Sequence, residues 1–357
     1  MALDILNARL SNQRLTGTPL ASPADVVSWL GAVQAQEYDQ AKWALAMRSR
    51  RTSAAAIDRA LTDGAILRTH VLRPTWHFVT PADIRWMLAL TGPRISKAMA
   101  SYNRRFELDA AVFRKSENVI ARALRGGVQL TRQELKVALQ RGGVNADGVE
   151  RLAFLTIQAE IDAVICSGGR RGNQSTYALL DERVPSSRPL SREDALAELT
   201  RRYYSSHGPA QIHDFAWWSG LTVGDARAGL EMVASELKTE TVDGRSYWFG
   251  KTVRSLTVPR RAYLLGLYDE YLIAYKDRSV ALDRSQWTRI TSADAFLAPV
   301  ILDGRVIAGW KKAARGEKTL LRVKPFAPPG RTVSSAVAEA VDRYASFSGQ
   351  DLELAWE

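Results

Sequence analysis

The chain has 357 residues, and its 49 Lys and Arg against 38 Asp and Glu give a formal net charge of +11. With 46% hydrophobic and 24% charged residues, the composition excludes a largely disordered chain and indicates two or three globular domains. A single cysteine, Cys166, excludes an intrachain disulfide and a cysteine-based zinc cluster, and it fits a reducing compartment. The excess of arginine favours a polyanionic partner such as nucleic acid.

Several other classes of protein are disfavoured by the sequence. The most apolar stretch, residues 152–166, contains Gln158, Glu160 and Asp162, so we expect no membrane span and no signal peptide, and a cytoplasmic, nucleoid-associated location. Four scattered histidines are too few for a metal cage, and we expect neither a metal nor a cofactor. The sequence also lacks a phosphate-binding loop, a dinucleotide fingerprint, an HExxH motif and a nucleophile elbow.

The first part of the chain reads as helices followed by a β-hairpin. A helix is predicted over residues 3–14, and Ser22-Pro23-Ala24-Asp25 provides a cap, a first-turn proline and an early acid for a helix ending near Leu30. A further helical stretch covers residues 55–61. The pattern then changes to a period of two over residues 66–79, with Arg73-Pro74 as the expected turn.

The same order of elements returns twice. In the second unit, helices are expected at 110–125, 131–141 and 150–165 before a hairpin with its tip at 168–173. In the third unit, helices are expected at 191–206, 211–220 and 223–237 before a hairpin that turns at Asp243-Gly244. Short helices closed by a hairpin are typical of winged helices. Beyond about residue 251, strand-like runs and a last helix over 333–346 predict a small sheet or barrel.

The predicted fold is therefore mainly α with β-hairpins, an α+β class. It consists of three tandem winged-helix domains and a small C-terminal antiparallel β-barrel. The predicted boundaries are 1–105, 106–188 and 189–250 for the winged helices, and 251–357 for the barrel with its C-terminal helix. Three such domains in one chain remove the usual need to dimerise on DNA, and we expect a monomer.

Gln34 and Gln36 are the first candidate site residues. If the segment around them is extended, both side chains project from one face with Ala35 turned inward. Two carboxamides can then converge on one small target. The alternative is that they cap the helix or are simply solvated.

The first hairpin displays polar side chains on an apolar base. A two-residue turn at Arg73-Pro74 places His70 opposite His77. One face then carries Arg68, His70, Thr75 and His77, and the other carries Leu67, Thr69, Val71, Trp76 and Phe78. We predict a DNA-binding surface here, with Arg73 at its turn. A structural histidine pair is the alternative, and an odd-numbered loop would shift the pairing.

Further basic residues occur in the second hairpin and the C-terminal part. Arg170 and Arg171 lie between glycines at a hairpin tip, which suits phosphate contacts. Lys276 and Arg278 follow Tyr275, and Lys311 and Lys312 follow Trp310. Aromatic and basic residues occur together in this way on nucleic-acid surfaces.

Several segments together resemble the AlkZ-like bacterial DNA glycosylases, also called the winged-helix DNA-binding domain-containing family. The resemblance covers most of the chain. Its matching pieces are Gln34-Ala35-Gln36, Arg68-Thr69-His70 through Arg73 to Thr75-Trp76-His77-Phe78-Val79, Asp269-Glu270-Tyr271 to Asp277-Arg278, and Asp303-Gly304-Arg305 to Gly309-Trp310-Lys311. Arg305 joins the expected DNA contacts on this basis.

The resemblance implies three winged helices and a barrel around a concave DNA channel, with the glutamine motif at its centre. It also implies excision of N7-alkylated guanine and unhooking of interstrand crosslinks, with Gln34 and Gln36 as catalytic residues. The broader housekeeping branch of the family has aspartate in place of the second glutamine, so Gln36 places the chain with the branch associated with crosslinking natural products.

The chemistry is consistent with two amides. An N7-alkylguanine is cationic and leaves as a neutral base, so the enzyme has only to stabilise an oxocarbenium-like sugar and position a water. Glu37 or Asp39 is a candidate to assist as base. No lysine in the motif offers a Schiff-base nucleophile, so a monofunctional glycosylase is expected. The alternatives are a winged-helix DNA-binding protein or regulator without activity, and a protein that sequesters the alkylating compound itself.

Overall fold

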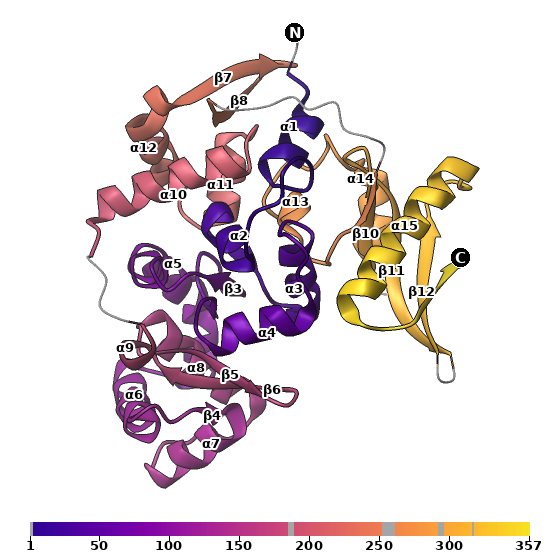
Figure 1. Cartoon of the computed structure of the whole chain (residues 1–357). Coiled ribbons are helices and arrows are strands. Elements are labelled where there is room, and N and C mark those ends of the chain that lie inside the picture. The colour runs from indigo at the N-terminus through magenta and orange to yellow at the C-terminus, as the bar shows by residue number, and fades with distance from the viewer. Residues whose placement is uncertain (1–2, 185–188, 252–260, 292–295, 316–317) are drawn as a thin grey trace.

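The computed structural model describes residues 3–184, 189–251, 261–291, 296–315 and 318–357 (Figure 1). Helices and strands are mixed, as the sequence predicts. Three groups of helices, each with a small sheet, precede a larger C-terminal sheet. The predicted boundary between the second and third domains, at residues 188–189, touches a segment outside the described residues. The division into domains therefore stays a prediction.

The first group contains five helices and a three-stranded sheet. They are α1 (Ile5–Asn12), α2 (Pro23–Leu30), α3 (Tyr38–Ala46), α4 (Ala54–Thr62) and α5 (Ile84–Arg105), with β1 (Val33–Gln34), β2 (Leu67–His70) and β3 (Trp76–Val79) in the order β1-β3-β2. The start of α2 is the predicted one. Ser22 accepts a hydrogen bond from the backbone N–H of Asp25, whose carboxylate accepts one from the N–H of Ser22.

The register of the first hairpin differs from the predicted one. His70 pairs with Trp76 and Thr69 pairs with His77, because five residues separate the strands. Leu72 adopts a left-handed conformation with φ of 64° in this loop, which allows the odd-numbered turn. His70 and His77 therefore point to opposite faces of the sheet, and the predicted common face does not exist.

The second group follows the predicted order closely. It comprises α6 (Ala110–Leu124), β4 (Leu130–Thr131), α7 (Arg132–Arg141), α8 (Val149–Ile161), β5 (Ile165–Arg171), β6 (Gln174–Leu179) and α9 (Leu180–Arg183), with strands in the order β4-β6-β5. Its buried cluster, which runs from Leu108 to Tyr177, draws on no residue outside this group. In Figure 1 the group lies below the first one.

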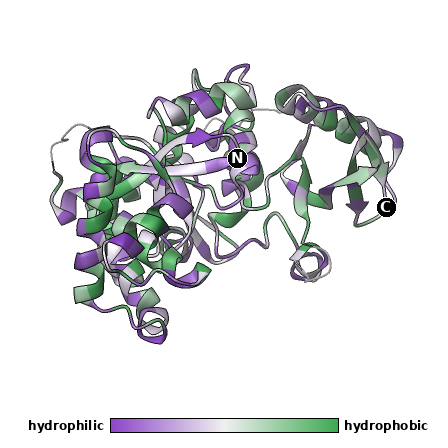
Figure 2. Ribbon diagram, turned by 90° about the horizontal axis from the view of Figure 1, so that it is seen from below, coloured by the Kyte–Doolittle hydropathy of each residue, from purple (hydrophilic) through white to green (hydrophobic). Residues whose placement is uncertain are grey.

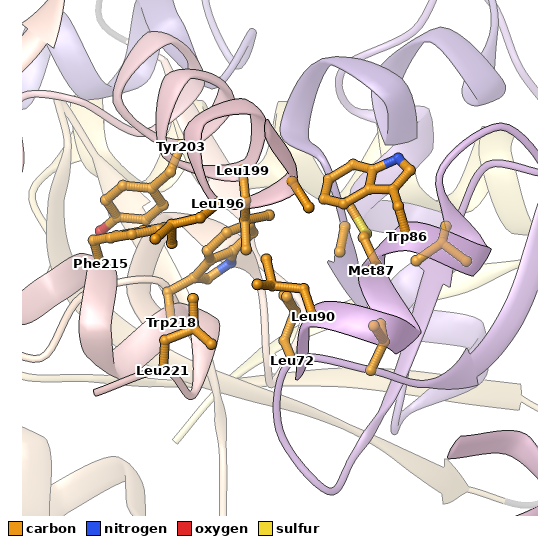
Figure 3. Close-up of a cluster of buried hydrophobic side chains, with 14 of the residues drawn as sticks. Leu72, Trp86, Met87, Leu90, Leu196, Leu199, Tyr203, Phe215, Trp218 and Leu221 are labelled. Carbon is orange, nitrogen blue, oxygen red and sulfur yellow. The ribbon is translucent and has the colours of Figure 1, made fainter. Parts of the chain in front are cut away.

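The third group packs directly on the first. It comprises α10 (Arg192–Ser206), α11 (Ile212–Ser219), α12 (Val223–Val233), a 3₁₀ turn (Ala234–Glu236), β7 (Leu237–Val242) and β8 (Arg245–Gly250). Figure 3 shows side chains of both groups in one cluster, including Trp86 and Leu90 beside Leu199 and Trp218. Gly220, with φ of 69°, permits this approach, because a Cβ there would lie 2.1 Å from the Leu72 carbonyl oxygen.

The C-terminal part is an open mixed sheet. Its strands are β9 (Ala262–Leu264), β10 (Ala298–Leu302), β11 (Arg305–Arg315), β12 (Lys318–Pro325) and β13 (Leu352–Trp356), in the order β13-β12-β11-β10-β9. Its helices are α13 (Glu270–Ile273), α14 (Arg284–Thr291) and α15 (Arg331–Ser348). The predicted last helix is confirmed as α15. A closed antiparallel barrel is not observed among the described strands, because β13 and β9 form the two ends of the sheet. The sheet is mixed because α15 returns the chain and sets β13 parallel to β12.

The hydrophobic cores cross the predicted boundaries of the first domain. One buried cluster combines Val33 and Phe78 with Val300 and Tyr344, so the C-terminal sheet packs on the first group. Hydrophobic and hydrophilic residues alternate along many helices in Figure 2, as expected for amphipathic helices around cores. No described helix has the length and apolar character needed to cross a membrane.

Candidate active site

Gln34 lies at the contact between the first group, the third group and the C-terminal part. It ends β1 opposite His77 of β3, and its side chain is 7% exposed. Its backbone N–H donates to Glu270 Oε1 at 2.8 Å, and its Oε1 accepts from Arg73 Nη2 at 3.1 Å. Because arginine has only donors, this bond identifies the oxygen end of the amide. The amide N–H groups of Gln34 then remain to donate elsewhere.

A buried carboxylate, that of Glu270, holds the backbone of Gln34 in place. Glu270 is fully buried, and its Oε2 accepts from Trp218 Nε1 at 2.9 Å and lies 3.5 Å from His207 Nε2. Burial alone would raise the pKa of Glu270, but the His207 ring and the Gln34 N–H outweigh it and hold this pKa below its ordinary value. An ionised Glu270 fits its two hydrogen-bond donors, the Gln34 N–H and the Trp218 Nε1–H. Neither group could accept a hydrogen bond from a protonated carboxyl group.

Gln36 differs from Gln34 in its surroundings. The strand ends at Gln34, Ala35 is buried and donates its N–H to the Trp76 carbonyl oxygen at 2.7 Å, and Gln36 is exposed at the bend before α3. The period-two argument for a common face therefore does not extend to Gln36. The motif presents one buried amide and one solvent-facing amide.

Glu37 and Asp39 are both exposed beside the motif. Glu37 lines a small hollow together with Gln34, Gly266 and Tyr268. Asp39 instead contacts Lys42 Nζ at 3.2 Å. Of the two predicted candidates for a base, Glu37 is thus the one that shares a hollow with Gln34.

The two histidines of the first hairpin are buried, so the predicted exposed histidine surface is wrong. His70 Nδ1 contacts the Glu160 carboxylate of the second group. His77 Nδ1 donates to the Thr75 carbonyl oxygen at 2.9 Å, and its Nε2 has no hydrogen-bond partner among the described residues. The shifted register explains this result, because each histidine faces a neighbouring group of helices instead of solvent.

Buried His77 predicts a stability that depends on pH. Burial, together with the charge of Arg73, lowers its pKa to about 3, and burial also lowers the pKa of His207. In the unfolded chain a histidine takes up a proton near pH 6.5. The unfolded state therefore gains protons that the folded state does not bind as the pH falls from about 6.5 toward 3, and stability is lost over that window.

For His77 alone this loss should reach about 1 kcal/mol between pH 6 and pH 5. We expect His77→Gln to remove about that much of the fall in the free energy of unfolding measured by urea denaturation. The exposed His213 provides the control, and His213→Gln should keep the wild-type dependence. Equal slopes for wild type and His77→Gln would show that His77 takes up its proton in the folded protein as readily as in the unfolded chain.

Arg68 joins the motif to the second group. Its Nε and Nη2 donate to the Ala35 carbonyl oxygen at 3.1 and 2.9 Å, and its backbone N–H donates to Ser167 Oγ. Burial lowers the pKa of Arg68 to about 10, which leaves it charged at neutral pH. Its guanidinium carbon lies 4.0 Å from the centre of the Trp76 ring.

The other predicted DNA-binding residues fall into separate places. Arg73 and Arg278 lie on the exposed Trp217, with guanidinium carbons 5.7 and 5.6 Å from its ring centre. Thr75 is half-buried in the hairpin loop. Arg171 pairs with Glu134 at 2.7 Å. Exposed residues elsewhere on the surface are Lys276 after α13 and Arg305, Lys311 and Lys312 on β11.

Several residues that surround the motif were not predicted as site residues. Glu270 was noted only as part of a matching segment, and Trp218 and Trp217 not at all. Glu270 is 236 residues from Gln34, so no local pattern could have paired them. An acidic pair directly before a short apolar run, Asp269-Glu270, was the available signal. Within the described ranges, no group of three or more potential metal ligands comes together.

The fold agrees with the comparison to known proteins. The profile of the family described as "DNA glycosylase AlkZ-like" matches residues 27–347, and the chain belongs to this family of enzymes, which hydrolyse N-glycosyl bonds in DNA. A relative from Streptomyces sahachiroi, named "Interstrand DNA cross-link repair glycosylase", is 26% identical over 96% of this chain and 95% of its own length. The solved structure of Streptomyces sahachiroi DNA glycosylase AlkZ has a TM-score of 0.82 at 23% identity, with 99% and 98% of the two chains covered.

Proposed function

We propose that this protein hydrolyses the N-glycosidic bond of N7-alkylated guanine, including guanines held in interstrand crosslinks, and leaves an abasic site. The observation that carries the proposal is the fixed amide of Gln34. Its backbone is held by Glu270 and its side chain by Arg73, beside the solvent-facing Gln36. The name of the Streptomyces relative, a crosslink repair glycosylase, supports the same substrate class.

The geometry suits a reaction with a good leaving group. An N7-alkylated guanine already carries a positive charge, so its departure needs no general acid. With its oxygen bonded to Arg73, the Gln34 amide can donate a hydrogen bond to the oxygen of an attacking water, and Glu37 can accept that water's proton. Arg73 still leaves one lone pair on the Gln34 oxygen, which can face the developing positive charge on the sugar.

The surroundings of Lys42 support a simple hydrolysis. Its ammonium group is nearly buried and donates to both carboxylate oxygens of Asp58, at 3.1 and 2.9 Å. Lys42 is thus engaged in the structure and is not presented to a sugar. We therefore propose a monofunctional glycosylase that does not cleave the strand by β-elimination.

The three helical groups, each of which contains an antiparallel hairpin, support three winged helices that bind duplex DNA as a monomer. Besides Arg68 and Arg73, we propose phosphate or base contacts for the exposed or half-exposed basic residues, which are Arg170, Arg171, Lys276, Arg278, Arg305, Lys311 and Lys312. The cytoplasmic nucleoid is the proposed place of action.

The test is release of free base from a duplex with one N7-methylguanine. We expect the wild type to release 7-methylguanine and leave an alkali-labile abasic site, with no strand break before alkali. A Gln34→Ala/Gln36→Ala variant purified in parallel should be inactive, and Gln140→Ala, a surface glutamine of α7 that bonds Asp147, should keep wild-type activity.

Two results would argue for the alternatives. Tight, sequence-specific binding with no base release from N7-methylguanine or from a crosslinked duplex would favour a DNA-binding regulator. Binding of a free alkylating compound without DNA, again with no base release, would favour a sequestering protein.

A further inference from the structure

A pocket of about 400 Å³ lies between the first and second groups of helices. Its lining comes from α3, α4, the first hairpin, the start of α7, α8 and the hairpin β5–β6. We call it the arginine–aromatic pocket after six of its residues, Tyr38, Arg68, Trp76, Arg132, Arg170 and Tyr177. None of the catalytic steps proposed above uses it.

The three arginines of this pocket lie against its aromatic rings. The guanidinium carbon of Arg132 is 5.5 Å from the centre of the Trp76 ring, and that of Arg170 is 4.4 Å from the centre of the Tyr38 ring. The Nε of Arg170 is buried with no hydrogen-bond partner among the described residues. The one carboxylate in the lining, Glu160, is in contact with His70. The pocket therefore combines flat apolar walls with an excess of positive charge.

We propose that the arginine–aromatic pocket binds one unstacked nucleotide of the DNA, with its base among Tyr38, Trp76 and Tyr177 and its phosphate between Arg132 and Arg170. Aromatic rings bind bases through their π-faces whatever the sequence, and arginine binds phosphate in a bidentate manner. The volume lies within the range of small-molecule sites. The inference rests on the proposed function in that DNA is the ligand.

The position of the pocket indicates which nucleotide it takes. Tyr38 follows Gln36 by two residues, and Arg68 holds the Ala35 carbonyl oxygen inside the motif. The occupant thus lies beside the reacting guanine. A guanine tied to both strands cannot swing out into a pocket, so the nucleotide next to it is the one that leaves the stack. Its departure would open the duplex beside the lesion and admit the motif.

The test is the affinity for undamaged DNA with and without one extrahelical nucleotide. We expect the wild type to bind a duplex with a single bulged thymidine about 10-fold more tightly than the fully paired duplex, from the stacking of one base. Trp76→Leu and Arg132→Gln should each bind the two duplexes equally. The control Arg331→Gln removes the same charge from an exposed position on α15 and should keep the preference.

Competition distinguishes a nucleotide from another aromatic anion as the occupant of the pocket. Thymidine 5′-monophosphate at millimolar concentration should reduce the preference for the bulge, and a planar aromatic anion without sugar, anthraquinone-2-sulfonate, should be the weaker competitor. Equal affinity of the wild type for both duplexes would overturn the proposal, and so would displacement by anthraquinone-2-sulfonate alone, which would assign the pocket to the aromatic part of an alkylating compound. These measurements need no base release, so they can fail while the glycosylase activity stands, or succeed without it.

Discussion

Replacing Asp269 with asparagine should lower the free energy of unfolding by about 3–5 kcal/mol, because it leaves a buried arginine charge without its counter-ion. Arg48 and Asp269 are both 1% exposed, and the two guanidinium nitrogens of Arg48 donate to the two carboxylate oxygens at 2.9 and 2.6 Å. Arg48 also donates to the Gln13 and Ala44 carbonyl oxygens. The pair thus joins α1 and α3 to the segment that carries Glu270.

Asparagine is the sharpest replacement because it keeps the shape of Asp269 and can still accept the Tyr271 N–H at the start of α13. Urea denaturation measures the loss. In the control Asp181→Asn, a side chain that is 86% exposed loses its pair with Arg85, and the change should stay within about 1 kcal/mol. An Arg48→Met/Asp269→Leu variant should recover most of the lost stability. A loss below about 1 kcal/mol in Asp269→Asn would show that water or another group compensates the Arg48 charge.

Local signals in the sequence predicted most of the elements, but not α5, which is the longest described helix. The Ser22 cap and first-turn proline located the start of α2, and Asp243-Gly244 turns the third hairpin with φ of 50° and 72°, as its sequence predicts. Hydrophobic periodicity located α7, α8 and α10 to within a few residues. These features depend on residues close together in the chain, which is why sequence alone suffices for them.

Features that depend on tertiary packing were not predictable in the same way. The left-handed conformation of Leu72 gives the first hairpin a loop with an odd number of residues. No glycine or asparagine at this position indicates such a conformation in the sequence. His70 and His77 are consequently buried on opposite faces of the sheet, and not displayed on one face as predicted. The parallel strand β13 depends on where α15 docks. The support of Gln34 by Glu270 and Arg73 required three distant segments to meet, so sequence identified the motif and not its surroundings.

Gln34→Ala should lower the rate of base release from N7-methylguanine by about 10²-fold to 10³-fold, the usual effect of losing one preorganised hydrogen-bonding group. We expect little change in the affinity for undamaged duplex, because the side chain is 7% exposed and offers little surface to DNA. Single-turnover release at saturating enzyme separates the rate from binding. A fall in affinity with an unchanged rate at saturation would make Gln34 a DNA contact and not a catalytic residue.

Arg73 provides the decisive comparison, because the sequence predicts a DNA contact and the structure shows Arg73 bonded to Gln34 Oε1. If Arg73 orients the amide, Arg73→Met should lower the saturated rate about 10-fold or more, the value of a charge-assisted hydrogen bond. Arg278→Met is the matched control, since Arg278 lies on the same Trp217 ring. It should weaken binding and leave the saturated rate unchanged.

The double variant Gln34→Ala/Arg73→Met then separates the two roles of Arg73. Because Arg73 can orient an amide only while that amide is present, the double variant should release base no more slowly than Gln34→Ala alone. Additive losses would mean that Arg73 acts on DNA independently of Gln34. A positioning role also predicts that Arg73→Lys, which keeps the charge and loses the planar fork, does not restore the full rate.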